Sequence, residues 1–266
     1  MSTLAAYLDG VGFLGPGLTD WPAAARVLSG AAHWQAAPTV LPVPQCLPAA
    51  ERRRTGVPVR LTLAVGLEAS AAAAADPATL PAVFTSSGGD GQNCHEICQT
   101  LASADRQLSP TRFHNSVHNA AAGYWGIATG ATPASNALCA YDGSFGAGLI
   151  EALCQVAVEH NRVLLIAYDA GYPEPLHRAR PIPDSLGVAV VLAAERGATS
   201  IARLAAAPSS EHPDHMADAA LEGLRAAIPA ARALPLLALI ARRTPGRAVI
   251  DYQDGVRLAV EVSPCR

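Results

Sequence analysis

The sequence predicts a layered α/β domain in which helices cover both faces of a sheet. Two runs, residues 162–169 and 187–195, are almost wholly apolar, and strands of this kind are usually covered on both faces. Strand-like patterns alternate with helix-like patterns along the chain, which favours a largely parallel core. The helix predicted over residues 143–160 carries glycine and alanine on one face, so another element can approach it closely.

In the first half of the chain, the pattern predicts a strand near residues 4–12 and then a long irregular segment rich in Gly and Pro. Residues 57–76 are ambiguous. They contain an alternating run typical of a strand, but Pro58 and the alanine-rich residues 68–75 suit a helix. The remaining elements predicted here are a strand over 81–87, helices over 93–104 and 116–130, and a strand over 134–141.

In the second half, a break rich in Pro and Ser follows Ala207. We therefore expect an N-terminal domain over residues 1–207 and a short α/β C-terminal extension over residues 208–266 that packs on the same domain. Asp251 and Asp254 are predicted to lie in a hairpin turn. The predicted elements of the extension are a helix over 214–228 and strands over 236–241, 248–252 and 256–262.

Composition and charge exclude several classes of protein. The net charge of −3 and the isoelectric point near 6.2 argue against a nucleic-acid-binding protein, whose domain is usually basic. The sequence has no run of about 18 or more uncharged apolar residues, so no membrane span is predicted. Residues 1–17 carry Asp9 and lack a basic start, which argues against a signal peptide. We expect a soluble, cytoplasmic protein.

The cysteines form no C-x-x-C pair, and without a secretory signal we expect reduced, mostly buried thiols. Cys94 and Cys98 share one helix face, and His114 and His118 have the same spacing, so a composite metal site would need all four side chains. The alternative, which we favour, is a helix that packs two small thiols inward. The glycine-rich residues 86–91 match no phosphate-binding motif and indicate a tight turn. We therefore expect no metal and no cofactor.

The strongest local feature is the transition from strand to helix at residues 138–146, which we call the elbow. A side chain at such an elbow lies at a helix N-terminus, where backbone N–H groups stabilise negative charge, and many acyl-transfer enzymes place their nucleophile there. Cys139 is the one thiol available, and the alternative is that it is a buried structural thiol. Asp142 and Ser144 are the other polar candidates, and the alternative is that one of them caps the helix.

Several segments, read in order, resemble the N-terminal half of β-ketoacyl synthases over roughly residues 57–195. Residues 85–89 resemble the glycine-rich turn of that family, residues 113–123 a helix start that commonly reads Pro-Asn-Ala-Ala-Ala-Gly, and residues 137–152 the nucleophile strand and its helix. Arg180-Pro181-Ile182-Pro183-Asp184 is similar to the family's Arg-Pro-Phe-Asp. The resemblance implies a thiolase-like, layered α/β/α fold. Because the chain is shorter than a full synthase, it also implies a reduced C-terminal half.

The departures from the family pattern bear on function. When the helix that contains Glu151 is aligned with the synthase helix, the nucleophile position falls on Asp142, a poor thioester nucleophile; a shift of three residues would place Cys139 there. Synthases also need two histidines from their C-terminal half, and here only His212 and His215 follow residue 195, outside the family's His-Gly-Thr motif. The chain therefore resembles chain-length factors, including the short form found in aryl polyene clusters.

Chain-length factors imply a partner. The resemblance implies a heterodimer with a full-length, active β-ketoacyl synthase in polyketide, polyene or fatty-acid-type elongation, and an acyl carrier protein as a further partner. It also implies that the strand over 134–139 lies at the dimer axis and that residues 90–101 and 113–118 reach the end of the partner's acyl tunnel. The residues that we expect to face that tunnel are Asn93, Cys94, Ile97, Phe113 and Val117.

Two other functions stay open at the level of sequence. One is an enzyme that acts alone, either an acyltransferase that uses Cys139 or a hydrolase that uses Ser144. The other is a non-catalytic homodimer that binds an acyl carrier protein or a ligand. A homodimer is also compatible with the chain-length-factor interpretation, since an isolated subunit exposes an apolar face that can pair with itself.

Overall fold

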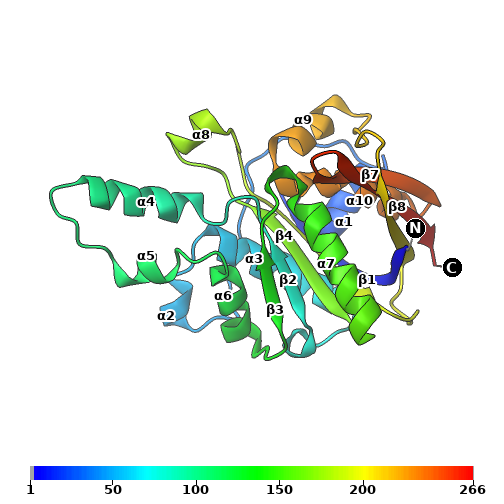
Figure 1. Cartoon of the computed structure of the whole chain (residues 1–266), viewed down its shortest axis with the longest axis horizontal. Helices are drawn as coiled ribbons and strands as arrows, with labels where there is room; N and C mark the ends of the chain where they lie inside the picture. Colours follow the sequence, from blue (N-terminus) through cyan, green and yellow to red (C-terminus); the bar gives the residue numbers. More distant parts are fainter. Residues whose placement is uncertain (1–2, 266) are drawn as a thin grey trace.

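A computed structural model describes residues 3–265 and contains one mixed sheet with helices on both faces (Figure 1). The strand order in the described residues is β3-β2-β4-β5-β1-β6-β8-β7. The strands are β1 (Leu4–Leu14), β2 (Ala82–Thr85), β3 (Ser135–Leu138), β4 (Val163–Asp169), β5 (Leu186–Ala193), β6 (Ala202–Ser209), β7 (Gly246–Gln253) and β8 (Val256–Pro264).

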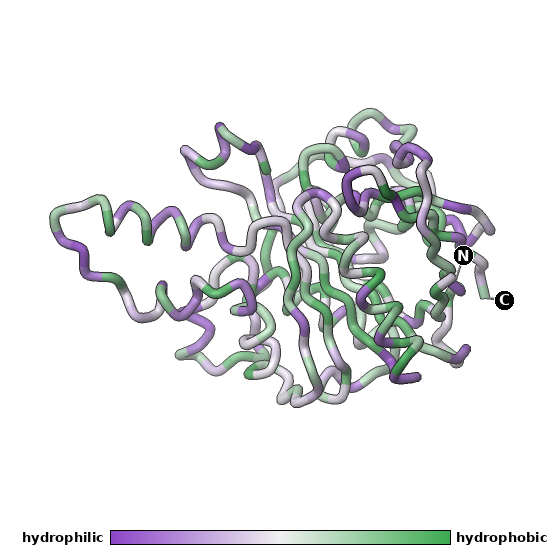
Figure 2. The backbone as a smooth tube through the Cα atoms, viewed as in Figure 1, coloured by the Kyte–Doolittle hydropathy of each residue, from purple (hydrophilic) through white to green (hydrophobic). Residues whose placement is uncertain are grey.

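Two apolar clusters lie on opposite faces of the sheet and define the layers. One cluster joins the sheet to the helices α1 (Trp21–Leu28), α7 (Ser144–Glu159), α9 (Ala219–Ala227) and α10 (Leu234–Arg242). The other joins the opposite face to α3 (Val57–Ala72) and α6 (Ala120–Thr129). The short helices are α2 (Ala49–Arg52), α5 (Pro110–His114) and α8 (Leu176–Ala179). Figure 2 shows the apolar residues concentrated in the strands and in the helices beside them.

The prediction of a largely parallel core is wrong. β2 runs parallel to β3 and β4, whereas every other pair in the described sheet is antiparallel, including β4 with β5 and β5 with β1. Every residue of β4 and β5 is buried, so the prediction that these strands are covered on both faces is confirmed. An apolar composition indicates that a strand is covered on both faces but does not indicate its direction. The prediction of a largely parallel core was wrong for this reason.

Packing resolves the ambiguous segment near residue 57 as helix α3, which lies directly against β1. A Cβ atom at Gly10 would stand 2.2 Å from the Ala69 carbonyl oxygen, and one at Gly12 would stand 2.0 Å from that of Val65. Only glycine permits this approach of helix and strand backbones.

Two elements near the C-terminus differ from the prediction. The strand expected over 236–241 is wrong, because this apolar run lies in α10, with Pro235 in the first helical turn. A short apolar run does not distinguish a buried helix from a buried strand. β6, which was not predicted, is dominated by alanine and therefore lacks a clear alternation, and residue 207 lies within it. The hairpin expected here is confirmed, because a turn at Asp254 joins β7 to β8, whereas Asp251 lies within β7 opposite Arg257.

The two edges of the sheet differ. On the outer edge of β7, the Asp214 N–H donates to the Val249 carbonyl at 2.8 Å, and the Asp214 carboxylate accepts the Val249 N–H at 2.9 Å. No strand pairs with the outer edge of β3 among residues 3–265, and its first residues, Ser135 and Asn136, are exposed. β3 therefore offers the open edge of the sheet. No helix within residues 3–265 is long and apolar enough to cross a membrane.

A projecting arm, residues 91–114, extends away from the sheet (Figure 1). It consists of α4 (Gly91–Ala102), a connecting loop and α5. Asn93 Nδ2 donates to the Arg112 carbonyl at 2.9 Å, and Glu96 forms an ion pair with Arg112, so polar contacts hold the two helices together. Most of α4 is exposed or half-buried, as expected for an element without a core of its own.

Candidate functional site

The backbone at the elbow turns sharply between β3 and α7. Tyr141 has a φ of +51°, in the left-handed region that non-glycine residues seldom adopt. The Ser144 hydroxyl donates to the Tyr141 carbonyl at 2.7 Å and accepts the Ala140 N–H at 3.0 Å. Ser144 is only 2% exposed, so its hydroxyl stabilises the turn and is not presented to a substrate.

Neither of the polar candidates caps the helix. The residue at the N-cap is Gly143, and no side chain bonds the first turn of α7 from that position. The expectation that Asp142 or Ser144 caps the helix is therefore wrong. Asp142 instead forms an ion pair with Arg180, whose Nη2 lies 2.6 Å from Oδ1, and a weaker one with Arg232 at 3.5 Å.

Arg180 pairs with Asp142, the residue that the resemblance assigns to the nucleophile position. Its guanidinium stacks over the Tyr141 ring, 3.6 Å from the centroid. Burial acts to lower the pKa of Arg180, but the bond to Asp142 and the charge of that carboxylate outweigh it, so the net change raises the pKa. The Asp142 carboxylate is thus paired with two arginines.

The C-terminal hairpin, formed by β7 and β8, lies against the elbow. A Cβ atom at Gly143 would stand 1.8 Å from the Tyr252 carbonyl oxygen, and one at Gly146 would stand 2.2 Å from that of Asp251. The Asp251 carboxylate accepts hydrogen bonds from Arg225 and Arg232 at 3.4 Å each. Beside this contact, residues of the hairpin and the elbow together line a polar pocket of about 590 Å³. Its charged lining residues are Asp142, Asp251, Asp254 and Arg257.

Cys139 has no hydrogen bond to a base or a cation among residues 3–265. Its thiol is exposed and donates to the Ser87 carbonyl at 3.2 Å. In the part of the chain that the structure describes, no hydrogen bond joins a histidine to Cys139, Asp142 or Ser144. His215 is bound to Glu222 at 2.8 Å. A thiol without an adjacent base or cation is a weak nucleophile.

The expectation of mostly buried thiols is wrong, and so is the interpretation of Cys139 as a buried structural thiol. Cys46, Cys94, Cys98 and Cys139 are exposed, and the other cysteines are half-buried. The inward packing expected for Cys94 and Cys98 is wrong for the same reason, because α4 lies on the projecting arm and not over the core. Residues 3–265 contain no group of three or more His, Cys, Asp or Glu that could hold a metal ion.

A buried carboxylate beneath the elbow joins three segments. Asp169 accepts the Ser87 N–H at 2.9 Å, the Ser87 hydroxyl at 2.5 Å and the Ala230 N–H at 2.8 Å. Burial raises the pKa of Asp169 to about 6, although these hydrogen bonds act in the opposite direction. The sequence analysis missed this residue. Its signal was a carboxylate at the end of an otherwise apolar strand.

The five residues expected to face a partner's tunnel lie on the arm or at its base. Phe113 and Val117 are 67% and 54% exposed, Cys94 is exposed and Ile97 is half-buried. Asn93 is buried, and its amide joins α4 to α5. The structure therefore places Cys94, Ile97 and Phe113 on the arm and Val117 at its base, and their role at a tunnel stays a prediction.

Comparison with known proteins identifies the family. Residues 21–242 match the N-terminal domain family of the β-ketoacyl synthases, and the chain belongs to this family. A search of curated proteins finds no match.

Solved structures show the same fold. The chain is similar to a chain in the complex of the ketosynthase ApeO with its chain length factor ApeC from Xenorhabdus doucetiae, at 23% identity and a TM-score of 0.74, covering 97% of this chain and 99% of that one. It is also similar to a chain of the ishigamide ketosynthase/chain length factor, at 13% identity and a TM-score of 0.72, covering 98% and 100%. A chain of AntDE:AntF, a type II acyl-carrier protein in complex with its ketosynthase, matches at 12% identity and a TM-score of 0.75, covering 99% and 100%. The predicted thiolase-like, layered α/β/α fold is confirmed.

Proposed function

We propose that this chain is a non-catalytic, ketosynthase-like subunit, a chain-length factor, that pairs with an active β-ketoacyl synthase in polyketide, polyene or fatty-acid-type elongation. The observation that carries the proposal is the elbow, where Arg180 and Arg232 hold Asp142, the residue that the resemblance assigns to the nucleophile position. The similar chains span the same length as this one and come from ketosynthase complexes, which supports the proposal. A cytoplasmic location and the division near residue 207 belong to the same proposal.

The surface that we assign to the synthase combines the open edge of β3 with the projecting arm. Exposed strand edges pair readily with another strand, and exposed apolar side chains contribute most when a partner buries them. At the opposite edge, Asp214 already pairs with Val249 in the middle of β7, whereas the outer edge of β3 has no pairing strand among residues 3–265. This asymmetry favours a closed complex of one chain with one partner over an open filament.

The decisive experiment is co-expression with the β-ketoacyl synthase encoded nearest to this chain, followed by size-exclusion chromatography with mass measurement. We expect a one-to-one complex, and we expect synthase activity or solubility to fall when this chain is omitted. An acyl carrier protein is then added to the complex to test it as a further partner. A chain that stays alone or as a homodimer and takes up an acyl group on Cys139 from a thioester donor would contradict the proposal.

Restoring sulfur to the nucleophile position is expected to restore no activity. Asp142→Cys places a thiol at the elbow, but no histidine is bonded there, and Arg180 and Arg232 lose their counter-charge. The measurement is condensation of acyl and malonyl thioesters by the variant without a synthase, beside mass-spectrometric labelling of the introduced thiol by iodoacetamide. Asp142→Ser serves as the matched control without sulfur. Condensation by the sulfur-containing variant alone would refute the view that this chain lacks catalytic machinery.

Changes of side-chain volume on the arm are expected to change product length. Ile97→Ala and Val117→Ala should allow longer acyl chains in the reconstituted pair, and the corresponding Phe variants should shorten them, because the proposed surface closes the partner's tunnel. Product length is measured by mass spectrometry. Val158→Ala, at an exposed position near the end of α7, is the control. An unchanged product length in all four variants would show that Ile97 and Val117 do not limit the partner's tunnel.

A further inference from the structure

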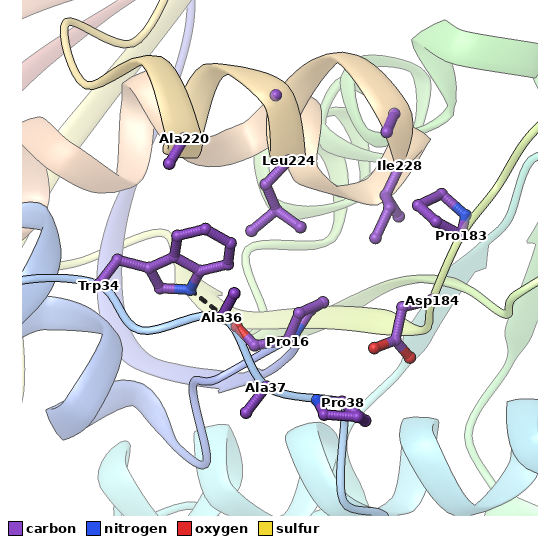
Figure 3. A pocket seen from close by; sticks show the side chains of 12 residues that line it. Pro16, Trp34, Ala36, Ala37, Pro38, Pro183, Asp184, Ala220, Leu224 and Ile228 are labelled. Atoms are coloured by element: carbon purple, nitrogen blue, oxygen red, sulfur yellow. Dashed lines mark hydrogen bonds between the residues drawn. The ribbon is translucent and has the colours of Figure 1, made fainter.

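An apolar pocket of about 500 Å³ lies between α9 and the extended segment after α1, away from the elbow (Figure 3). Its volume falls within the range of small-molecule sites, roughly 300–1,000 Å³. Figure 3 shows Leu224 and Ile228 pointing from α9 and its C-terminal end towards the space, opposite Ala37 and Pro38, with Trp34 at one end and Asp184 at the other. The remaining lining residues are Pro16, Ala36, Pro183, Ala220, Gly223 and Ala227.

The pocket is formed before any ligand enters. Trp34 Nε1 donates to the Pro16 carbonyl at 2.9 Å, which fixes the indole ring as one wall. The Asp184 carboxylate accepts the Thr39 N–H at 3.0 Å and the Ser185 N–H at 2.6 Å, which fixes its orientation. Rigid walls reduce the entropy lost on binding.

The lining also defines the chemistry of an occupant. Asp184 is the one charged residue in the lining, and the other lining residues are glycine or have apolar side chains. The indole nitrogen of Trp34 is already bonded to the Pro16 carbonyl. Each Asp184 oxygen accepts one backbone N–H, and a carboxylate has room for further donors. A cation is attracted by that carboxylate, whereas an anion is repelled.

We propose that this pocket binds a small molecule with an apolar or aromatic body and one ammonium group, with the body against Trp34 and the ammonium group at Asp184. The proposal does not depend on the function proposed above, because it concerns neither the elbow nor the arm. The pocket shares no lining residue with the polar pocket at the elbow, so it is a second and separate site on the chain.

The test uses phenethylamine as the probe and phenylpropionate, which has the same aromatic body with a carboxylate, as the matched anion. Binding to the full-length chain is measured by isothermal titration calorimetry and by ligand-observed NMR. Because the amine can form a charge-assisted bond to Asp184, we expect it to bind at least about tenfold more tightly than the acid.

Gly223→Leu is the key variant. Gly223 lines the pocket and a Cβ atom there meets no other atom within 4 Å, so a leucine side chain can be added at this position without displacing the walls. We expect it to weaken binding of the amine at least about tenfold. Ala36→Leu fills the pocket from the opposite wall and replaces the first variant if that one does not fold. Gly123→Leu, at another helical glycine with open space around it, is the control and should bind as the unmodified chain does.

Tight binding of the amine that both pocket variants weaken and the control does not would support the proposal. Equal binding of amine and acid, equal binding by the unmodified and filled chains, or no binding of the amine at up to about 10 mM would overturn it. Displacement of the amine by the synthase in the complex would also overturn it, because the pocket would then belong to a protein interface.

Discussion

Replacing both Phe113 and Val117 by Asp is expected to abolish the complex with the synthase while leaving the fold of this chain intact. Both side chains are largely exposed in the chain alone, so little apolar burial is lost in the fold. In a complex they would be buried, and a carboxylate in a desolvated interface is costly. A hot-spot residue contributes about 2 kcal/mol or more, and two buried, unpaired carboxylates add their own cost, so we expect the dissociation constant to rise by more than about 100-fold.

Val158→Asp is the matched control for this prediction. Val158 is 75% exposed, more than Phe113 or Val117, but it lies near the end of α7 and outside the proposed surface. Affinity is measured by calorimetry or surface plasmon resonance, and circular dichroism verifies that each variant is folded. If the control weakened the complex as much as the double variant, exposed apolar area in general would explain the result. If the double variant bound normally, the arm would not be part of the interface.

The sequence predicted most of the fold where local pattern determines structure. The apolar strands β4 and β5, the helix α7 and the C-terminal hairpin all follow from short patterns of hydrophobic residues. Strand direction did not follow, because it depends on how distant segments pair. β1 illustrates this, since it pairs with β5 and β6, which lie far along the chain.

The site was predictable in position but not in chemistry. The elbow could be located from the glycines that follow β3, and Asp142 could be placed there by resemblance. Its partners Arg180 and Arg232 lie 38 and 90 positions further along the chain, so only the folded structure brings them together. The exposure of Cys139 could not be predicted either, because nothing in the local sequence pattern places β3 at the edge of the sheet.

Under the proposed function, these contacts would explain how a ketosynthase-like fold can lack the reaction. The elbow keeps its turn, with Tyr141 in the left-handed region and Ser144 bonded to the backbone. Charged residues from the C-terminal part then pair with its carboxylate and position the hairpin beside it. A fold does not determine a function, so the residues at the elbow carry the proposal that this chain is a non-catalytic subunit.

Removing Arg225 is expected to cause the largest loss of stability from a single change in this network. Arg225 is 4% exposed and binds Glu222 through two nitrogens at 2.7 and 2.8 Å, with Asp251 at 3.4 Å. Arg225→Ala leaves both carboxylates without this cation. Breaking a fully buried pair costs about 3–5 kcal/mol, and because both carboxylates are partly exposed we expect about 2–3 kcal/mol. That loss corresponds to a fall in melting temperature of roughly 4–10 °C.

Arg247→Ala is the matched control, because Arg247 also binds a carboxylate through two nitrogens, that of Glu211 at 2.7 and 2.8 Å, but both partners are exposed. We expect it to cost less than about 1 kcal/mol.

The bond to Arg225 lowers the pKa of Glu222, so the stabilisation from the Arg225–Glu222 pair is present above the ordinary pKa of Glu and is lost as the pH falls through the lowered value. The difference in unfolding free energy between the unmodified chain and Arg225→Ala should therefore shrink in acid. Equal losses in both variants, or a difference independent of pH, would show that burial does not strengthen the Arg225 network.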